Sequence, residues 1–302
     1  MTVSRPARLL ELPQRRHPAR AALVSLRPRQ WTKNALLFAG IIFAAKLGDG
    51  VRWLEAFAAF AAYCAASSAA YLVNDVRDAE HDRAHPVKRS RPIARGEIAA
   101  RTAYAFALAL ALASVVLVVP LGWPSLALLA AFFVLQLSYT ARLKHVVLID
   151  VMTIAGLFVV RAAAGAAGVH VRISPWLLLC TALLALFLAL AKRRGELVLV
   201  GADATPGRPV LEGYSLALVD QLVSVVAACT VIAYSLYTFT ARDSKALMVT
   251  IPFVVFGVFR YLLLIHRQDL GEEPEEVLLR DRPILACIAA WAVCAAVILV
   301  LT

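Results

Sequence analysis

The sequence lacks the short motifs by which many soluble enzymes are recognised. It contains no glycine-rich phosphate loop, no GxSxG and no HExxH, which argues against P-loop nucleotide chemistry, α/β-hydrolases and zinc proteases. Charged residues make up only 17% of the chain, and no basic patch interleaved with aromatic residues points to a nucleic-acid partner. Its few cysteines lie within apolar segments, without the spacing of disulfides or metal ligands: Cys64, Cys180, Cys229, Cys287 and Cys294.

Long apolar segments make up most of the 302 residues. The chain is 61% hydrophobic, has a mean hydropathy of +0.75 and is dominated by Ala and Leu, which predicts membrane helices rather than barrel strands. We therefore expect an all-α polytopic membrane protein with a basic, partly disordered N-terminal segment (1–30) and a nine-helix transmembrane catalytic domain (31–302). The expected spans are 34–47, 53–73, 102–121, 123–140, 146–168, 175–191, 216–240, 246–265 and 283–301.

Lysine and arginine lie mostly in alternate loops. With the N-terminus placed inside, the cytoplasmic segments contain 24 of the 31 basic residues and the opposite loops contain 5. The positive-inside rule then predicts a multi-pass protein of the cell (inner or plasma) membrane, with the N-terminus inside and the C-terminus outside. This distribution explains the net charge of +11 better than a nucleic-acid partner does. The predicted cytoplasmic segments are 1–33, 77–101, 141–145, 192–208 and 266–282.

The segment Tyr71–Glu97 contains chemistry that membrane packing does not explain. Asn74, Asp78 and Asp82 recur at i, i+4 and i+8, which predicts one helical face, and Asp75 lies about 100° away and can flank it. Carboxylates in a row repel one another unless a cation lies among them, and hard oxygen ligands favour Mg²⁺. A charged stretch at a helix end is usually a solvated loop, but these acids begin inside an apolar segment, where ionisable groups are usually functional.

A basic segment follows the acidic face. Lys88, Arg91 and Arg95 lie among prolines and a glycine, which predicts a loop. Its cations can bind the oxygens of a diphosphate that a metal leaves free. The sequence therefore predicts a metal–diphosphate site, facing the cytoplasm, where the second span ends.

Further candidate ligands lie in other loops that are predicted to be cytoplasmic. Lys33 opens the first span, Tyr139 and Lys144 join spans four and five, and Lys192 and Arg193 follow span six. Each basic residue also has an interpretation as a determinant of topology, and Tyr139 as an interfacial anchor. These alternatives stay open at the level of sequence.

The fifth span contains two charged residues of its own. Arg161 lies deep within it, where a cation is costly and needs either a structural ion pair or a ligand. Asp150 lies one turn into the span, where capping or pairing competes with metal binding.

Several segments resemble the UbiA superfamily of intramembrane prenyltransferases. NDVRDAEHD (74–82) is similar to its NDxxDxxxD signature, and KRSRPIARG (88–96) and YTARLK (139–144) also match positions characteristic of that group. The resemblance covers the chain from RPRQWTKN (27–34) onward. It implies nine helices around a lipid-accessible cavity.

Within the superfamily, RPRQWTKN and the KRRGE after span six (192–196) resemble one branch most closely. That branch transfers 5-phosphoribosyl from phosphoribosyl diphosphate to decaprenyl (polyprenyl) phosphate for cell-wall arabinan. Many other members have a second Asp-rich motif after span six, where this chain has three adjacent cations. The resemblance implies Mg²⁺ on Asp78 and Asp82, assisted by Asn74 and Asp75. The substrate-binding residues that we predict are Lys33, Tyr71, Lys88, Arg91, Arg95, Tyr139, Lys144, Arg161, Lys192 and Arg193.

Two alternative functions remain open from the sequence. An ordinary UbiA prenyltransferase would use a prenyl diphosphate and an aromatic acceptor, and would need the same first motif. A transporter or scaffold is less favoured, because transporters concentrate charge at the bilayer midplane, whereas this chain concentrates it at one face. The sequence also leaves open a homo-oligomer.

Overall fold

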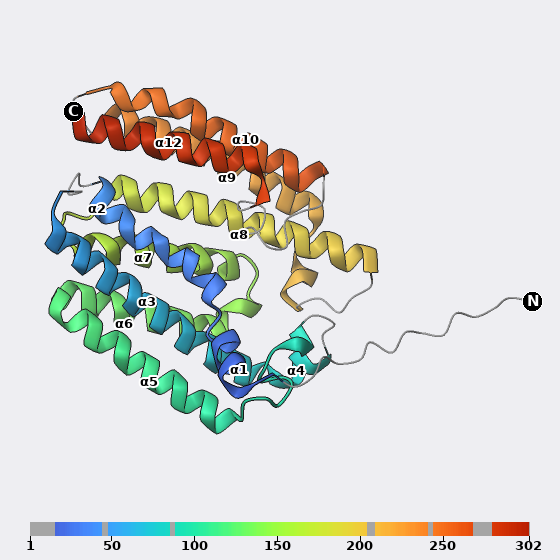
Figure 1. Ribbon diagram of the computed structural model, residues 1–302. Coiled ribbons are helices and arrows are strands. Elements are labelled where there is room, and N and C mark those ends of the chain that lie inside the picture. The colour runs from blue at the N-terminus through green and yellow to red at the C-terminus, as the bar shows by residue number, and fades with distance from the viewer. Residues whose placement is uncertain are drawn as a thin grey trace, which may run out of the picture.

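The computed structural model describes residues 16–43, 48–84, 88–203, 209–240, 244–267 and 280–301, with the side chains of 200–203 excepted. All regular elements in these ranges are helices, packed side by side into a bundle (Figure 1). The first fifteen residues of the predicted N-terminal segment lie outside the described residues. The remainder of that segment contains the short helix α1 (Pro18–Ser25).

In the described part of the chain, eight helices are long and apolar enough to cross a membrane. They are α3 (Gly50–Arg77), α5 (Ala100–Val118, extended by the 3₁₀ turn η3, Val119–Leu121), α6 (Trp123–Ala141), α7 (Ile149–Gly168), α8 (Pro175–Asp203), α9 (Leu216–Thr240), α10 (Ile251–Arg267, preceded by η6, Ala246–Thr250) and α12 (Arg282–Leu301). Short helices connect them: α4 (Ala79–Ala84), η2 (Lys88–Ser90), η4 (Leu143–His145) and η5 (Pro209–Gly213). The predicted all-α polytopic fold is confirmed.

The first predicted span, 34–47, is the one whose form differs most from the prediction. It begins at Pro28 as a 3₁₀ helix, η1 (Pro28–Phe38), and continues as α2 (Ala39–Phe43); residues 44–47 lie outside the described part. Proline starts the segment because its fixed φ suits a first helical turn and its missing N–H needs no partner there. When η1 and α2 are counted together as the first span, the described helices approximate the nine that the sequence predicts.

Glycines allow η1 and α2 to lie directly against α7. A Cβ atom on Gly165 would lie 2.1 Å from the carbonyl oxygen of Leu37, and one on Gly40 would lie 2.7 Å from the backbone of Ala166. Only glycine permits such backbone contact, as in other membrane helix pairs with small residues at the interface. The small-residue run of α7 therefore fixes the position of the first span.

The helix α7 lies at the centre of the bundle. One apolar cluster joins α7 to α8, α9, α10 and α12, with Val151 and Phe187 among its buried residues. A second cluster joins α7 to α3, α6 and η1, with Leu157 and Phe132 among its members. Because both clusters include α7, which lies between α3 and α8 in Figure 1, charged residues on α7 are buried.

The loops predicted to be cytoplasmic meet at one end of the bundle, the end at which α3 terminates. Lys144 of η4 bonds Asp78 after α3, the backbone N–H of Leu148 before α7 bonds Tyr214 after η5, and Arg194 near the end of α8 bonds a carbonyl near the end of α10. We call this the site end. It lies beside α1 and α4, as Figure 1 shows.

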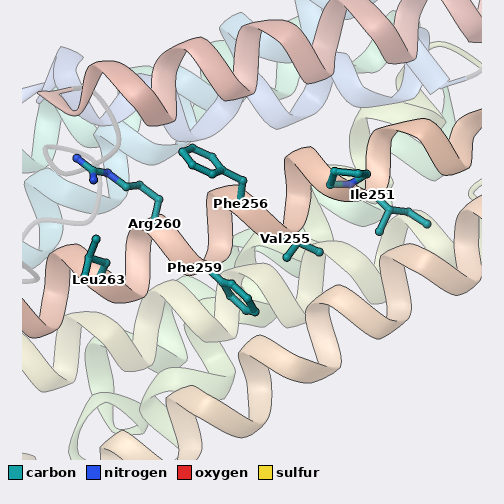
Figure 2. A pocket seen from close by; sticks show the side chains of 7 residues that line it. Ile251, Val255, Phe256, Phe259, Arg260 and Leu263 are labelled. Carbon is teal, nitrogen blue, oxygen red and sulfur yellow. The ribbon is translucent and has the colours of Figure 1, made fainter.

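An open groove of about 680 Å³ lies on the outer face of α10. Its labelled side chains, among them Phe256 and Phe259, project from this helix in Figure 2. The one charged group in its lining, Arg260, bonds Asp281 at 2.9 Å. An apolar groove on a membrane helix suits hydrocarbon chains rather than an ionic substrate. The charged side chains that could bind an ionic substrate lie at the site end.

Candidate functional site

The helix predicted to carry the acidic face is interrupted at Asp78 in the structure. α3 ends at Arg77, Asp78 adopts φ −92° and ψ 3°, and α4 begins at Ala79. Asn74 and Asp78 therefore lie together, but Asp82 belongs to a separate short helix. Two backbone bonds with i→i+4 spacing cross this turn, from the N–H of Asp78 to Asn74 at 2.9 Å and from the N–H of Asp82 to Asp78 at 2.8 Å. The stacking of all three side chains on one face therefore stays a prediction.

Asp78 lies between an amide and an ammonium group. The side-chain nitrogen of Asn74 donates to Oδ2 of Asp78 at 3.0 Å, and Nζ of Lys144 lies 3.0 Å from Oδ1. The Asp78 side chain is 32% exposed, so its carboxylate remains accessible from the aqueous end. The structure thus brings together three predicted site residues from α3 and η4.

Asp75 and Asp82 form a second acidic pair, bridged by one guanidinium. Nη1 of Arg91 lies 3.2 Å from Asp75 and 2.6 Å from Asp82. Both carboxylates are nearly buried, with side chains 3% and 5% exposed. Charge-assisted bonds of this kind are stronger than neutral ones, so Arg91 holds the basic loop against the ends of α3 and α4.

Arg27 completes this pair from the N-terminal segment, and its role was not predicted. Its Nη2 bonds Asp75, and its guanidinium lies 4.8 Å from the ring centre of Tyr71. Its backbone has φ 53°, which is uncommon for a residue other than glycine and occurs often at functional positions. The sequence signal was present, because Arg27 begins the RPRQWTKN stretch, but distance along the chain hid its contact with Asp75.

The basic loop contains two further predicted cations, Arg95 and Lys88, and Arg95 belongs to a neighbouring ion-pair network. Nε of Arg95 lies 3.1 Å from Glu97, which also binds Arg16 at 3.1 Å. Glu97 is nearly buried, with its side chain 2% exposed. Lys88 is half-buried in η2. This network fastens the N-terminal segment to the loop that carries Arg91.

Arg193 contributes to a buried ion-pair network at the same end. Its Nε donates to Asp150 at 2.7 Å, its Nη1 bonds Glu196, and only 1% of its side chain is exposed. The hydroxyl of Tyr214 donates to the other oxygen of Asp150 at 2.7 Å, and accepts a bond from the N–H of Leu148. Burial and the bond to Asp150 raise the pKa of the Tyr214 phenol.

This network shows that Asp150 forms an ion pair, and it restricts the access of a substrate to Arg193. Asp150 is fully buried and pairs with Arg193, as one of its two sequence interpretations predicts. A phosphate could reach Arg193 only by displacing carboxylates, so its predicted substrate contact remains a prediction.

The last predicted residues lie at different depths. Lys33 in η1, Tyr139 in α6 and Lys192 in α8 are all half-buried. Arg161 lies within α7, more than three turns from the end of that helix at Ile149, and only 5% of it is exposed. The structure therefore separates Arg161 from the carboxylate pairs.

The carboxylates fit a magnesium ion by their chemistry. Among the described residues, no three Asp, Glu, His or Cys side chains converge into a ready-made metal site. The possible metal ligands at the end of α3 are all oxygen atoms. The carboxylates of Asp75 and Asp82 are balanced by Arg91, and that of Asp78 is balanced by Lys144. Mg²⁺ typically takes only one or two carboxylates and completes its shell with water and substrate phosphates, which this arrangement permits.

The electrostatics of the site suit a polyanion bound together with a divalent cation. Arg91 and Lys144 already neutralise the carboxylates. If a metal takes over the carboxylates, both side chains become available to phosphate oxygens without leaving the site. This exchange of partners is the chemistry that the arrangement supports.

Known proteins resemble this chain in sequence and in structure. Residues 35–279 match the sequence model of the UbiA prenyltransferase family. The chain is 35% identical over 285 residues to the decaprenyl-phosphate phosphoribosyltransferase of Mycolicibacterium smegmatis, covering 88% of both chains. It is 36% identical over 278 residues to the enzyme of that name from Mycobacterium tuberculosis, covering 88% of this chain and 90% of that one.

A solved structure shares the fold. The UbiA homolog from Archaeoglobus fulgidus, bound to GPP and Mg²⁺, superposes with a TM-score of 0.71 over 93% of this chain and 100% of that one. Sequence identity is 17%, so this likeness concerns the fold alone.

Proposed function

Because this chain belongs to the UbiA prenyltransferase family, we propose that it transfers 5-phosphoribosyl from phosphoribosyl diphosphate to a polyprenyl phosphate, decaprenyl phosphate in the first instance, with release of diphosphate. The product would serve cell-wall arabinan synthesis. The observation that carries the proposal is the site at the end of α3, where Arg91 and Lys144 balance acidic groups in a chain similar to enzymes of that name. The protein is thus a transferase of the UbiA superfamily.

The segment after α8 supports a donor other than a prenyl diphosphate. At the end of α8, Arg193 pairs with Asp150 and Glu196, and Arg194 pairs with Asp220 at 2.7 Å. The segment also has three adjacent cations, Lys192 to Arg194, where many members of the superfamily have a second Asp-rich motif, so it lacks the row of acids that a two-metal prenyl diphosphate mechanism would use. This difference favours phosphoribosyl diphosphate over the ordinary prenyl donors of the superfamily.

The chain's own residues would act mainly by position and charge. Asp78 and Asp82, with Asn74 and Asp75 beside them, would hold Mg²⁺, which when bound neutralises charge on a diphosphate leaving group. Lys144 and Arg91 would bind the diphosphate oxygens. Lys88 and Arg95, which lie on the same loop as Arg91, would assist them.

The bond changes need no general base. The bond between C1 of the ribose and the diphosphate oxygen breaks, and the diphosphate leaves with the electron pair. A phosphate oxygen of the lipid, already ionised near neutral pH, forms the new bond to C1. This is consistent with a site that contains carboxylates, lysine and arginine but is not built around a histidine, and it makes catalysis a matter of positioning and electrostatics.

We further propose that the site end faces the cytoplasm, in the cell (inner or plasma) membrane. The loops that contain most of the lysine and arginine meet at this end, and positive charge is concentrated on the inner side of membrane proteins. Phosphoribosyl diphosphate is soluble and would enter from that side. The lipid acceptor would approach through the bilayer.

A donor comparison tests the proposal. The purified full chain in detergent is incubated with Mg²⁺ and either labelled phosphoribosyl diphosphate plus polyprenyl phosphate, or labelled prenyl diphosphate plus hydroxybenzoate. We expect labelled lipid only in the first reaction, and none with the Asp82→Ala variant. Product in the second reaction alone would identify an ordinary prenyltransferase and refute the proposed donor.

A further inference from the structure

Arg161 is a buried cation whose described partners are all neutral. Its Nε donates to the side-chain oxygen of Asn34 at 2.8 Å, and its Nη1 donates to the carbonyl of Leu157 at 3.0 Å. The guanidinium faces the rings of Phe132 and Phe158, at 4.9 and 5.3 Å. Within the described ranges, no carboxylate lies within ion-pair distance of it, whereas Arg91 and Arg193 each have two.

Two hydroxyl groups of α3, the helix that packs beside α7, are buried without a hydrogen-bond partner in the described part of the chain. They belong to Tyr63 and Ser67, which are 1% and 4% exposed. The Tyr63 ring and the Arg161 guanidinium both contact the Phe132 ring, with distances to its centre of 5.2 and 4.9 Å, and Ser67 lies one helical turn from Tyr63 on α3. Buried polar groups are nearly always satisfied in folded proteins, so an unbalanced cation beside two unsatisfied hydroxyls indicates a ligand with several acceptor oxygens and negative charge.

The helix α3 connects these hydroxyls to the carboxylates at the site end. At 100° per residue, one arc of about 80° around the helix axis contains five polar residues: Tyr63, Ser67, Tyr71, Asn74 and Asp78. Asp78 lies eleven positions after Ser67, roughly 16 Å along the helix axis. The polar face that begins at the carboxylates therefore continues inward to Arg161.

We propose that Arg161, Tyr63 and Ser67 form a subsite for a phosphate monoester, separate from the diphosphate site. The proposal rests on the proposed function, whose substrates supply two such groups: the 5-phosphate of the donor and the phosphate of the lipid acceptor. A guanidinium binds phosphate through paired N–H groups, and hydroxyls donate to the remaining oxygens. Among the described residues, Arg91, Arg95 and Arg193 pair with carboxylates, whereas the charge of Arg161 has no carboxylate to balance it and can be balanced by an anion.

Hydroxyl removal tests the subsite with little risk to folding. Tyr63→Phe and Ser67→Ala are made in the full chain, in lipid nanodiscs. Binding is measured for phosphoribosyl diphosphate with Mg²⁺, and for polyprenyl phosphate with polyprenol as its phosphate-free match; thermal unfolding is measured alongside. We expect affinity for one phosphate ligand to fall about tenfold, the loss of a hydrogen bond to a charged group, while the melting temperature stays equal or rises.

The ligand whose affinity falls identifies the source of the phosphate. If polyprenyl phosphate loses affinity and polyprenol does not, the lipid phosphate occupies the subsite; if phosphoribosyl diphosphate loses affinity, the 5-phosphate does. Ser125→Ala is the matched control, because that buried hydroxyl already donates to Leu121. It should lower the melting temperature slightly and leave both affinities unchanged.

Unchanged affinity for both phosphate ligands in both variants would overturn the subsite, and so would a lower melting temperature with unchanged binding, which marks structural hydroxyls. Arg161→Lys gives an independent check, since it retains the charge but loses the paired N–H groups; normal affinity in a folded Arg161→Lys protein also contradicts the subsite. Failure of the subsite alone leaves wild-type binding and turnover intact. Failure of the proposed function would appear as wild-type protein that binds neither substrate, which overturns both.

Discussion

Replacing Arg91 with glutamine should change metal and donor affinity in opposite directions. Arg91 bridges Asp75 and Asp82 in the structure and so competes with any cation for Asp82. With the donor bound, the same guanidinium is expected to bind phosphate oxygens. Arg91→Gln therefore removes a competitor of the metal and a ligand of the donor together.

The structure sets the size of both effects. A hydrogen bond to a charged group contributes about 1.5–3 kcal/mol, and the Arg91 side chain is 25% exposed, which places it near the lower limit because solvent screens it. About 1.5 kcal/mol corresponds to roughly tenfold in affinity. Divalent metal should therefore bind about tenfold more tightly without donor, and the KM for phosphoribosyl diphosphate should rise by about tenfold.

Two measurements on the same purified variant check this prediction. Binding of Mn²⁺, as a spectroscopic substitute for Mg²⁺, is titrated by electron paramagnetic resonance without donor, and initial rates are measured against donor concentration at saturating metal. Arg95→Gln is the matched control, because Arg95 pairs with Glu97 rather than with the metal carboxylates, and metal affinity should not change in it. Weaker Mn²⁺ binding in Arg91→Gln would refute the competition that we infer.

Three further substitutions test the site and the fold. Asp78→Ala should abolish turnover while leaving the unfolding temperature nearly unchanged, because this carboxylate is partly exposed; near-normal rates at excess Mg²⁺ would remove it from the metal site. Asp150→Asn should lower the free energy of unfolding by about 3–5 kcal/mol, since it leaves buried Arg193 without its innermost carboxylate; a denaturant titration with an unchanged midpoint would contradict this. Gly165→Ala should destabilise the protein by about 1–3 kcal/mol or more, because its Cβ would overlap the backbone of η1. Gly257→Ala, whose Cβ meets nothing within 4 Å, is its control in a thermal unfolding assay, and equal losses in the two variants would count against the close contact.

Local sequence patterns predicted the parts of this molecule that depend on one segment at a time. Hydropathy gave the long spans, and the i, i+4 spacing placed Asn74 beside Asp78 on one face of α3. The charge count placed the basic loops at one end, and there Lys144 meets Asp78. These features follow from helical periodicity and the cost of charge in a bilayer, both of which can be read along the chain.

Features that depend on contacts between distant segments were not predicted. Arg27 and Asp75 are 48 residues apart, and no periodicity connects them. Arg193 was predicted as a substrate ligand from its charge, but its burial against Asp150 depends on how α7 and α8 pack. The turn at Asp78 was missed because the pattern of acids continues through it unchanged.

The central claim is that a divalent metal at the end of α3 binds the diphosphate of the donor. Its most direct test is pulsed electron paramagnetic resonance on the full chain loaded with Mn²⁺ and phosphoribosyl diphosphate. We expect bound Mn²⁺ with hyperfine coupling to ³¹P, and loss of that coupling in Asp78→Ala. Donor-loaded protein without bound Mn²⁺, or with ³¹P coupling unaffected by Asp78→Ala, would contradict it.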